Sequence, residues 1–222
     1  MKSDKKENRN CSRESLLLYA VTDRAWTGKL TLLEQVEQAL EGGVTFLQLR
    51  EKNLCEEEFL KEAKALKTLC LSYGVPFVIN DNVDIAIAVD ADGVHVGQDD
   101  MEAGSVREKI GPEKILGVSV QTVEQALLAE ARGADYLGVG AVFPTGTKTD
   151  AVDVPHEQLQ QICQAVKIPV VAIGGISEDN VDRLTGRKLA GIAVVSAIFG
   201  KEDILSATRE LKRRTERMVR DE

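Results

Sequence analysis

Short apolar runs alternate with longer amphipathic segments along this chain. The runs are rich in Val, Ile and Leu, and several lack two-residue alternation, as expected for parallel strands that are buried on both faces. There are eight of them, at Leu16–Thr22, Val44–Arg50, Pro76–Asn80, Gly93–Gly97, Ile115–Ser119, Tyr136–Gly140, Pro169–Ile173 and Ile192–Ser196. Because a helical pattern follows each strand, the sequence predicts an α/β protein with the fold of a single (β/α)8 TIM barrel.

The segments between the runs have the periodicity of amphipathic helices. Thr31 and Glu34 have the spacing of a capping box at the start of the first helix. A doubly wound open sheet is the competing fold, and it is disfavoured because the turn after the first strand lacks G-x-G-x-x-G. Helices are expected at 31–41, 56–73, 123–131, 159–166 and 204–219, with shorter ones after the third, fourth and seventh strands.

The length of 222 residues suits one barrel-sized domain. We expect residues 15–222 to form this catalytic domain and residues 1–14 to be a disordered N-terminal leader. The net charge of −8 leaves no basic surplus for a general nucleic-acid binder. Neither a membrane span nor a signal peptide is evident, so we expect a cytoplasmic protein without a membrane partner.

The active site of such a barrel lies at the C-terminal ends of its strands. Nearly every predicted strand end in this chain carries a polar side chain or a pair of glycines. Their convergence on one face is a stronger signal than any of them alone. The residues are Gln48, Arg50, Lys52, Asn80, Asp81, Asp99, Asp100, Ser119, Thr145, Thr147, Lys148, Gly174, Gly175, Val195 and Ser196.

Two of these strand ends suggest a phosphate site. Gly174 and Gly175 follow the seventh strand, and Ser196 ends the eighth. Loops at these positions form the usual phosphate site of TIM barrels, through backbone N–H groups and a helix N-terminus. Glycines let the backbone approach a phosphate without a Cβ in the way. A simple turn is the alternative interpretation.

Asp81 and Asp100 are expected on adjacent strand ends, where two carboxylates repel each other unless a cation lies between them. Mg²⁺ is the natural candidate, because it accepts one or two carboxylates and completes its shell with water and phosphate oxygens. Two solvated loop acids, or Asp81 as the N-cap of a helix near Val83, are the alternatives. Asp99 is a rival ligand.

Arg50, Lys52 and Lys148 are cations on the same predicted face. Together with the acidic pair they suggest a diphosphate held by a metal ion and by cationic side chains. His95 lies inside an apolar strand, so we expect a hydrogen-bonded barrel residue and not a catalytic base. No Ser/His/Asp or Cys/His triad is evident.

The motifs, taken in order, resemble those of the thiamine phosphate synthase family. The resemblance covers about residues 16–200, whereas the N-terminal leader and the Thr185–Gly191 entry to the last strand depart from the family pattern. Its motifs are Q-L-R-E-K (48–52), I-N-D (79–81), G-V-H-V-G-Q-D-D (93–100), L-G-V-S (116–119), G-x-G-x-V-F-P-T-x-T-K (138–148), V-A-I-G-G-I (171–176) and V-V-S-A-I (194–198).

The resemblance implies a transferase that joins 4-amino-2-methyl-5-(diphosphooxymethyl)pyrimidine to a thiazole phosphate, releasing diphosphate. It implies Mg²⁺ as cofactor and two phosphorylated small molecules as partners, and leaves homo-oligomer formation open. The implied roles are pyrimidine diphosphate binding for Gln48, Arg50, Lys52, Asn80, Ser119 and Lys148, thiazole phosphate binding for Thr145, Thr147, Gly175, Val195 and Ser196, Mg²⁺ binding for Asp81 and Asp100, and catalysis for Arg50, Lys52, Ser119 and Lys148.

These residue types suit early loss of the diphosphate, which would give a pyrimidinylmethyl cation that the thiazole nitrogen captures. Such a reaction needs charge neutralisation and no general base. Electron-withdrawing groups on the pyrimidine are therefore expected to slow the chemical step. The Pro144–Val154 loop is the best lid candidate.

Two rival functions use the same barrel. One is an isomerase, such as a thiazole tautomerase or a sugar-phosphate epimerase, which would keep the phosphate site but not need the diphosphate clamp. The other is a non-catalytic regulator that binds a thiamine precursor. The set of Lys52, Asp81, Asp100 and Lys148 argues against both.

Overall fold

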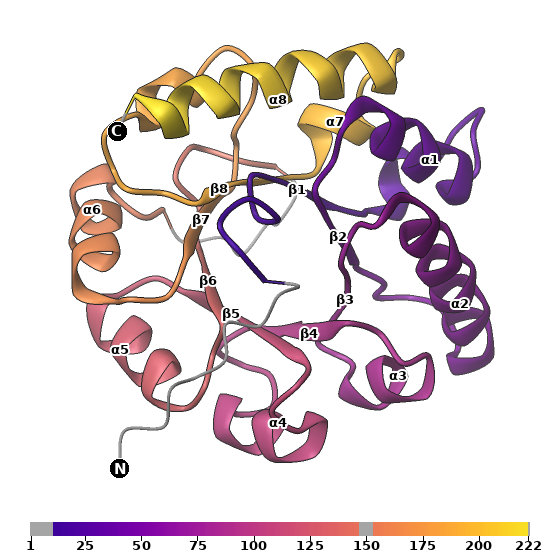
Figure 1. Ribbon diagram of the computed structural model, residues 1–222. Helices are drawn as coiled ribbons and strands as arrows, with labels where there is room; N and C mark the ends of the chain where they lie inside the picture. The colour runs from indigo at the N-terminus through magenta and orange to yellow at the C-terminus, as the bar shows by residue number, and fades with distance from the viewer. Residues whose placement is uncertain (1–10, 147–152, 222) are drawn as a thin grey trace.

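The computed structural model describes residues 11–146 and 153–221, in which eight parallel strands close into a barrel (Figure 1). Each strand pairs with the next in chain order, and β1 pairs with β8 to complete the ring. The predicted TIM barrel is confirmed. The strands are β1 (Leu18–Val21), β2 (Phe46–Leu49), β3 (Phe77–Asn80), β4 (Gly93–Val96), β5 (Ile115–Val120), β6 (Tyr136–Val139), β7 (Val170–Ile173) and β8 (Gly191–Val194).

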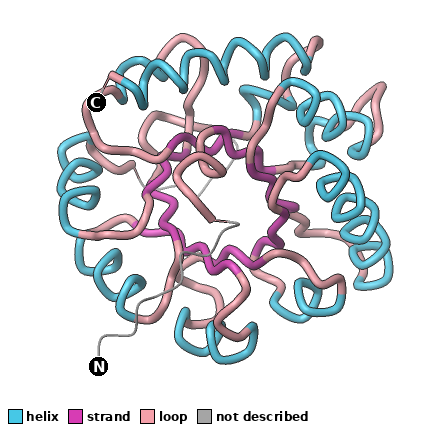
Figure 2. Tube along the Cα trace, viewed as in Figure 1, coloured by secondary structure: helices cyan, strands magenta, loops and turns pink. Residues whose placement is uncertain are grey.

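The helices form an outer layer around the strands (Figure 2). The predicted helices at 56–73 and 123–131 have the observed bounds, and the other three long helices are found with ends shifted by three residues or fewer. The α-helices are α1 (Leu32–Gly42), α2 (Glu56–Tyr73), α3 (Val83–Ala88), α4 (Ala103–Ile110), α5 (Val123–Ala131), α6 (His156–Ala165), α7 (Ser196–Phe199) and α8 (Ile204–Arg220), and the 3-10 helices are η1 (Arg24–Trp26) and η2 (Val181–Leu184).

Two local predictions need correction. The short helix expected after β7 is the 3-10 helix η2, because the Asn180 side chain accepts a hydrogen bond from the Ser177 N–H at 2.8 Å and ties up the preceding turn. Ser196 does not end the eighth strand. β8 stops at Val194, and Ser196 begins α7, where its carbonyl accepts from the Gly200 N–H at 3.0 Å.

The capping box at the start of α1 is confirmed. The Thr31 side chain accepts from the Glu34 N–H at 3.3 Å, and the Glu34 carboxylate accepts from the Thr31 N–H at 2.7 Å. Gly43 ends the helix at φ 101°, a left-handed conformation that favours glycine. The chain therefore returns into β2 where the sequence predicts it.

Side chains of the strands alternate between the helix layer and the barrel interior. A separate apolar cluster fills the interior. Because of the alternation, Gln48, Asn80 and Ser119 also face inward, nearer the C-terminal ends of their strands than Phe46, Val78 and Ile115. The buried interior cluster comprises Leu16, Tyr19, Val21, Phe46, Val78, Ile115, Tyr136, Val171, Ala190 and Ala193.

The turn before β1 lies across the N-terminal mouth of the barrel (Figure 2). Leu16 is fully buried, and Cys11 packs partly buried against the interior cluster. Arg13 donates to the Leu189 carbonyl at 2.8 Å and holds the turn in place. Residues 1–10, which belong to the predicted leader, lie outside the described residues. No helix in the described part of the chain is long and apolar enough to cross a membrane.

Candidate active site

The two predicted metal-binding carboxylates are neighbours at the C-terminal end of the barrel. Asp81 follows β3, and Asp100 lies in the loop after β4. The pKa of Asp100 is raised above its ordinary value, first by burial and then by its hydrogen bond with Asp81. The Asp100 carboxylate also accepts from the Gly97 N–H at 2.7 Å. The two carboxylates therefore interact with each other and form one acidic centre.

A cation completes this centre. The Nζ of Lys52 lies 2.6 Å from Oδ2 of Asp81. Half of the Lys52 side chain is exposed, so the ammonium group can move from the carboxylate to an anion that enters the pocket. Lys52, Asp81 and Asp100 thus meet at one point although they come from three different loops.

The backbone at Asp81 is held in an unusual conformation. Its φ is 61°, in the left-handed region that few non-glycine residues occupy. Its N–H donates to the His95 carbonyl at 2.8 Å. The N-cap of α3 is Asn82, whose side chain accepts from the Ile85 N–H at 2.9 Å. The alternative interpretation of Asp81 as that N-cap is therefore wrong, and its carboxylate is left for the pocket.

The acidic pair fits a metal ion that needs few protein ligands. Within residues 11–146 and 153–221, no group of three or more His, Cys, Asp and Glu side chains could hold a metal ion. Two carboxylates suit Mg²⁺, because this ion keeps several waters and takes oxygens from substrate phosphates. A closed, all-protein zinc or calcium site would need more ligands.

Salt bridges fix the segment after β2 that carries Arg50 and Lys52. Nη1 of Arg50 lies 3.0 Å from Oδ2 of Asp23. Nη2 of Arg24 lies 3.0 Å from Oε1 of Glu51, whose side chain is only 3% exposed. These two salt bridges anchor the segment that carries Arg50 and Lys52 to the loop after β1.

Inside the barrel, His95 is a hydrogen-bonded residue, as predicted. Its Nδ1 lies 2.8 Å from the Tyr136 hydroxyl and its Nε2 lies 2.9 Å from Oγ of Ser119. Burial lowers the pKa of His95 to about 4, and the charge of Asp100 opposes this shift only in part. The imidazole is therefore neutral at pH 7, and it positions Ser119 without acting as a charged group.

A hollow of about 600 Å³ opens at the same end of the barrel as the acidic centre, between the loops after β1, β6, β7 and β8. It brings together three residues expected to hold a phosphate: Thr145, Gly175 and Ser196. Two of its lining residues, Trp26 and Lys201, were not among the predicted site residues. Lys201 directly follows the Ser196–Gly200 turn and supplies a cation, which the sequence pattern alone did not distinguish from a solvated lysine.

Thr147 and Lys148, two of the predicted site residues, lie outside the described residues. The same holds for residues 147–152 of the lid candidate. At the near end of that loop, Phe143 packs edge-on against His156, with ring centroids 5.0 Å apart. At the far end, the Val154 N–H donates to the Ala141 carbonyl at 2.7 Å. The two ends of the loop are therefore close together, and its start, at Pro144 and Thr145, lines the 600 Å³ hollow.

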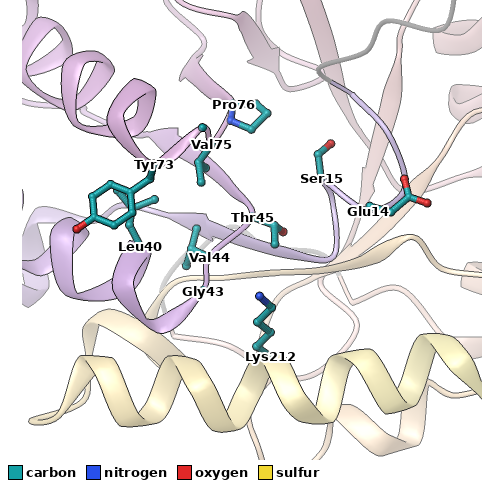
Figure 3. Close-up of a pocket in the computed structure, with 11 residues that line it drawn as sticks. Glu14, Ser15, Leu40, Gly43, Val44, Thr45, Tyr73, Val75, Pro76 and Lys212 are labelled. Carbon is teal, nitrogen blue, oxygen red and sulfur yellow. The ribbon is translucent and has the colours of Figure 1, made fainter.

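Another hollow, of about 490 Å³, lies at the opposite end of the barrel (Figure 3). It is formed by turns that lead into β1, β2 and β3, among them Thr45 and Pro76, and Lys212 of α8 reaches toward it (Figure 3). Turns at this end of a TIM barrel serve stability, whereas chemistry is located at the other end. The candidate active site is therefore the acidic centre together with the 600 Å³ hollow at the same end of the barrel.

Known proteins resemble this chain over most of its length. The family model described as thiamine monophosphate synthase matches residues 18–198. A thiamine-phosphate synthase of Clostridium tetani is 52% identical over 194 residues, which cover 87% of this chain and 93% of that relative. A thiamine-phosphate synthase of Alkaliphilus oremlandii is 52% identical over 195 residues, covering 88% and 93%.

Solved structures give the same result. The thiamine phosphate pyrophosphorylase from Pyrococcus furiosus superposes with a TM-score of 0.87 at 45% sequence identity, covering 93% of this chain and 98% of that one. An (S)-3-O-geranylgeranylglyceryl phosphate synthase from Thermoplasma acidophilum has a TM-score of 0.67 at 13% identity, and this likeness shows only a shared fold.

Proposed function

Because the chain belongs to the thiamine monophosphate synthase family, we propose an assignment of its pocket to the two substrates of that family's reaction. The protein is a transferase of thiamine biosynthesis. It condenses 4-amino-2-methyl-5-(diphosphooxymethyl)pyrimidine with a thiazole phosphate to give thiamine phosphate and diphosphate. The relatives favour this activity over a tautomerase-like isomerase and over a non-catalytic regulator.

The acidic centre is the proposed site of the pyrimidine diphosphate. Lys52 and Arg50 would bind its diphosphate group, and Gln48, Asn80 and Ser119, which face the barrel interior, would contact the same substrate. Lys148 keeps its predicted role there as a further cation. The observation that carries this assignment is the 2.6 Å contact between Lys52 and Asp81 beside Asp100.

The hollow between the loops after β1, β6, β7 and β8 is the proposed site of the thiazole phosphate. Thr145, Gly175 and Ser196 line it, and Val195 precedes Ser196 at the end of β8. Thr147 keeps its predicted role at this phosphate. The acceptor is 4-methyl-5-(2-phosphooxyethyl)thiazole or its carboxylated form, with its phosphate held by backbone N–H groups and by Lys201.

Asp81 and Asp100 would hold Mg²⁺. When bound, the ion would neutralise charge on the diphosphate oxygens. The side chains of the protein do the remaining work: Lys52 and Arg50 stabilise negative charge as the diphosphate leaves, and the fixed barrel holds both substrates in line. The thiazole nitrogen has its own lone pair, so a neutral, buried His95 is compatible with the reaction, which needs no general base.

The direct test mixes the purified protein with both precursors and Mg²⁺ and measures thiamine phosphate and diphosphate. The expected result is equimolar formation of the two products that requires both precursors. Rearrangement of the thiazole phosphate without diphosphate release would identify the isomerase instead. Binding of a precursor without turnover would identify the regulator. We also propose a cytoplasmic location for this biosynthetic enzyme.

Mg²⁺ is expected to stabilise the wild-type protein against heat but not the Asp100→Asn variant. A ligand at ten times its Kd adds about 1.4 kcal/mol to the free energy of unfolding. In a chain of this size that corresponds to about 3–6 °C in Tm. Differential scanning calorimetry with and without Mg²⁺ measures the shift. An equal shift in the variant would place the ion elsewhere.

The metal-free protein should also respond to pH through Asp100. Because the pKa of this carboxyl is raised in the folded protein, the folded state binds its proton more tightly than the unfolded chain does. The resulting stability is present below the ordinary Asp pKa and is lost as the pH rises through the raised value. At pH 7 the Asp100→Asn variant should therefore have a higher Tm than the metal-free wild type. A lower Tm would show that the two carboxylates do not destabilise each other.

Gly175→Ala is expected to raise the KM for the thiazole phosphate by about tenfold and to lower the Tm. Gly175 has φ 64°, and a Cβ there would lie 2.7 Å from the Phe143 carbonyl oxygen. Backbone strain of this kind costs about 1–3 kcal/mol and would shift the phosphate-binding turn. Gly28→Ala is the control, because a Cβ at Gly28 meets nothing within 4 Å. Unchanged thiazole kinetics in Gly175→Ala would remove this turn from the phosphate site.

A further inference from the structure

A continuous chain of hydrogen bonds crosses the barrel interior beneath the candidate active site. It begins at Gln48 on β2, whose side-chain amide donates to the Tyr19 hydroxyl. The Tyr19 hydroxyl lies 2.8 Å from that of Tyr136, and the Tyr136 hydroxyl lies 2.8 Å from Nδ1 of His95. Nε2 of His95 lies 2.9 Å from Oγ of Ser119 on β5. The two ends of the chain, Gln48 and Ser119, are both proposed contacts of the pyrimidine diphosphate.

Two glycines that face the barrel interior leave space for this chain of hydrogen-bonded side chains. Gly117 faces inward on β5, and a Cβ at this position would collide with the Tyr136 ring and with Nδ1 of His95. At Gly138 on β6, a Cβ would lie 3.3 Å from Cε1 of His95. Interior positions of a barrel are otherwise filled by side chains. Two glycines around one imidazole therefore fix where the His95 ring can lie.

The number of protons available decides which group donates and which accepts at each step of this hydrogen-bond chain. A tyrosine hydroxyl has one proton, and burial raises the pKa values of Tyr19 and Tyr136, so both remain protonated. Tyr19 accepts from Gln48 and is left to donate to Tyr136, which in turn donates to Nδ1 of His95. A neutral imidazole whose Nδ1 accepts must carry its proton on Nε2. That N–H then donates to Ser119.

We infer that Tyr19, Tyr136 and His95 form a positioning network in which the Tyr136 proton, donated to Nδ1, holds His95 as the Nε2–H tautomer and thereby turns the Ser119 hydroxyl proton toward the pyrimidine diphosphate. The inference rests on the proposed function in one respect, the assignment of Ser119 to that substrate. Because the Ser119 oxygen already accepts from His95, its own proton is free to donate into the pocket. None of the three network residues touches the reacting atoms.

This arrangement favours a group that becomes more negative during the reaction. Negative charge on the diphosphate increases as its bond to carbon breaks, so a donor aimed at it stabilises the transition state more than the bound substrate. Loss of the network should therefore lower kcat more than it raises the KM for the pyrimidine diphosphate. A merely structural role would lower the Tm but would not set the tautomer.

The tautomer can be measured directly by NMR of protein labelled with ¹⁵N-histidine. The chain has two histidines, so the spectrum of a His156→Gln variant identifies the His95 signals. The wild type should show the proton on Nε2 and none on Nδ1. Tyr19→Phe should leave this tautomer unchanged, because Tyr136 can still donate to His95. Tyr136→Phe removes the donor to Nδ1 and should populate the Nδ1–H tautomer.

Kinetics give a second, matched comparison. Tyr136→Phe is expected to lower kcat about tenfold, the effect of one lost hydrogen bond in the pocket. His95→Gln can still accept from Tyr136 and donate to Ser119, so its kcat should stay within about threefold of wild type. His95→Leu can do neither, and its kcat should fall at least about tenfold.

A wild-type spectrum with the proton on Nδ1 would overturn the inference, even if no variant folds. So would a kcat of Tyr136→Phe within twofold of wild type, or equal losses in His95→Gln and His95→Leu. Failure of the proposed function looks different: His95 would carry its proton on Nε2, but the wild type would release no diphosphate from the two precursors.

Discussion

Replacing Asp100 with asparagine is expected to lower kcat by about 10²–10³-fold at a Mg²⁺ concentration that half-saturates the wild type. The amide keeps the size of the side chain and can still accept from the Gly97 N–H, but it has no charge with which to hold the ion. Excess Mg²⁺ should restore part of the activity, because Asp81 remains. Diphosphate release at several Mg²⁺ concentrations measures both effects.

Two neighbouring carboxylates serve as comparisons for this variant. Asp84 on α3 has a side chain that is 85% exposed, so Asp84→Asn should leave kcat and its Mg²⁺ dependence unchanged. Asp99→Asn tests the rival ligand beside Asp100. Full activity of Asp100→Asn at low Mg²⁺ would remove Asp100 from the metal site, and a large loss in Asp99→Asn would put Asp99 in its place.

Lys52→Met should lower kcat by about 10²-fold even at saturating Mg²⁺. Methionine keeps the length of the side chain but removes the ammonium group that lies 2.6 Å from Asp81. Without it, less positive charge faces the leaving diphosphate. Extra Mg²⁺ cannot compensate, because the ion binds at the carboxylates and not at the position of the Lys52 ammonium group. Steady-state diphosphate release with both precursors at saturation measures the loss.

Lys61→Met is the matched control, because Lys61 is an exposed residue of α2 on the outer helix layer. Its kcat should equal that of the wild type. Lys52→Arg should recover part of the activity, since it restores the positive charge but with the geometry of a guanidinium group. Wild-type kcat in Lys52→Met would contradict a role for this ammonium group at the diphosphate.

Much of the fold was predictable because local signals and tertiary packing agree. The predicted bounds of the helices at 56–73 and 123–131 are the observed ones. Each helix has an end signal in the sequence: Gly74 follows the first, and a capping box of Thr122 and Gln125 begins the second. The short segment after β7 was harder. Its side chains bond to nearby backbone groups, so a 3-10 turn replaced the expected helix. Such competition depends on side-chain geometry that a period does not reveal.

The site was predictable where strand ends converge, because the fold alone brings those ends together. Lys52, Asp81 and Asp100 follow this rule. Tyr19 and Tyr136 do not, since each looks like an ordinary strand residue. Their contact depends on which strand faces which across a closed barrel, and on the space left by Gly117.

Trp26 and Lys201 were missed for a related reason. Trp26 ends the 3-10 helix η1 and Lys201 follows α7. At both positions the sequence alone indicates only an exposed side chain. They line the 600 Å³ hollow because β1 pairs with β8, which brings the loops after these two strands side by side. This pairing of the first strand with the last depends on closure of the barrel and is not evident from either segment alone.

Calorimetric titration of the protein with diphosphate, with and without Mg²⁺, is the most direct measurement of whether metal and leaving group share one site. When two ligands bind together at one site, their affinities are coupled, and each ligand lowers the Kd of the other by the same factor. In the wild type, Mg²⁺ should lower the Kd for diphosphate at least about tenfold. A double variant with Asp81→Asn and Asp100→Asn should lose this gain in affinity. An undiminished gain in the double variant would contradict the account.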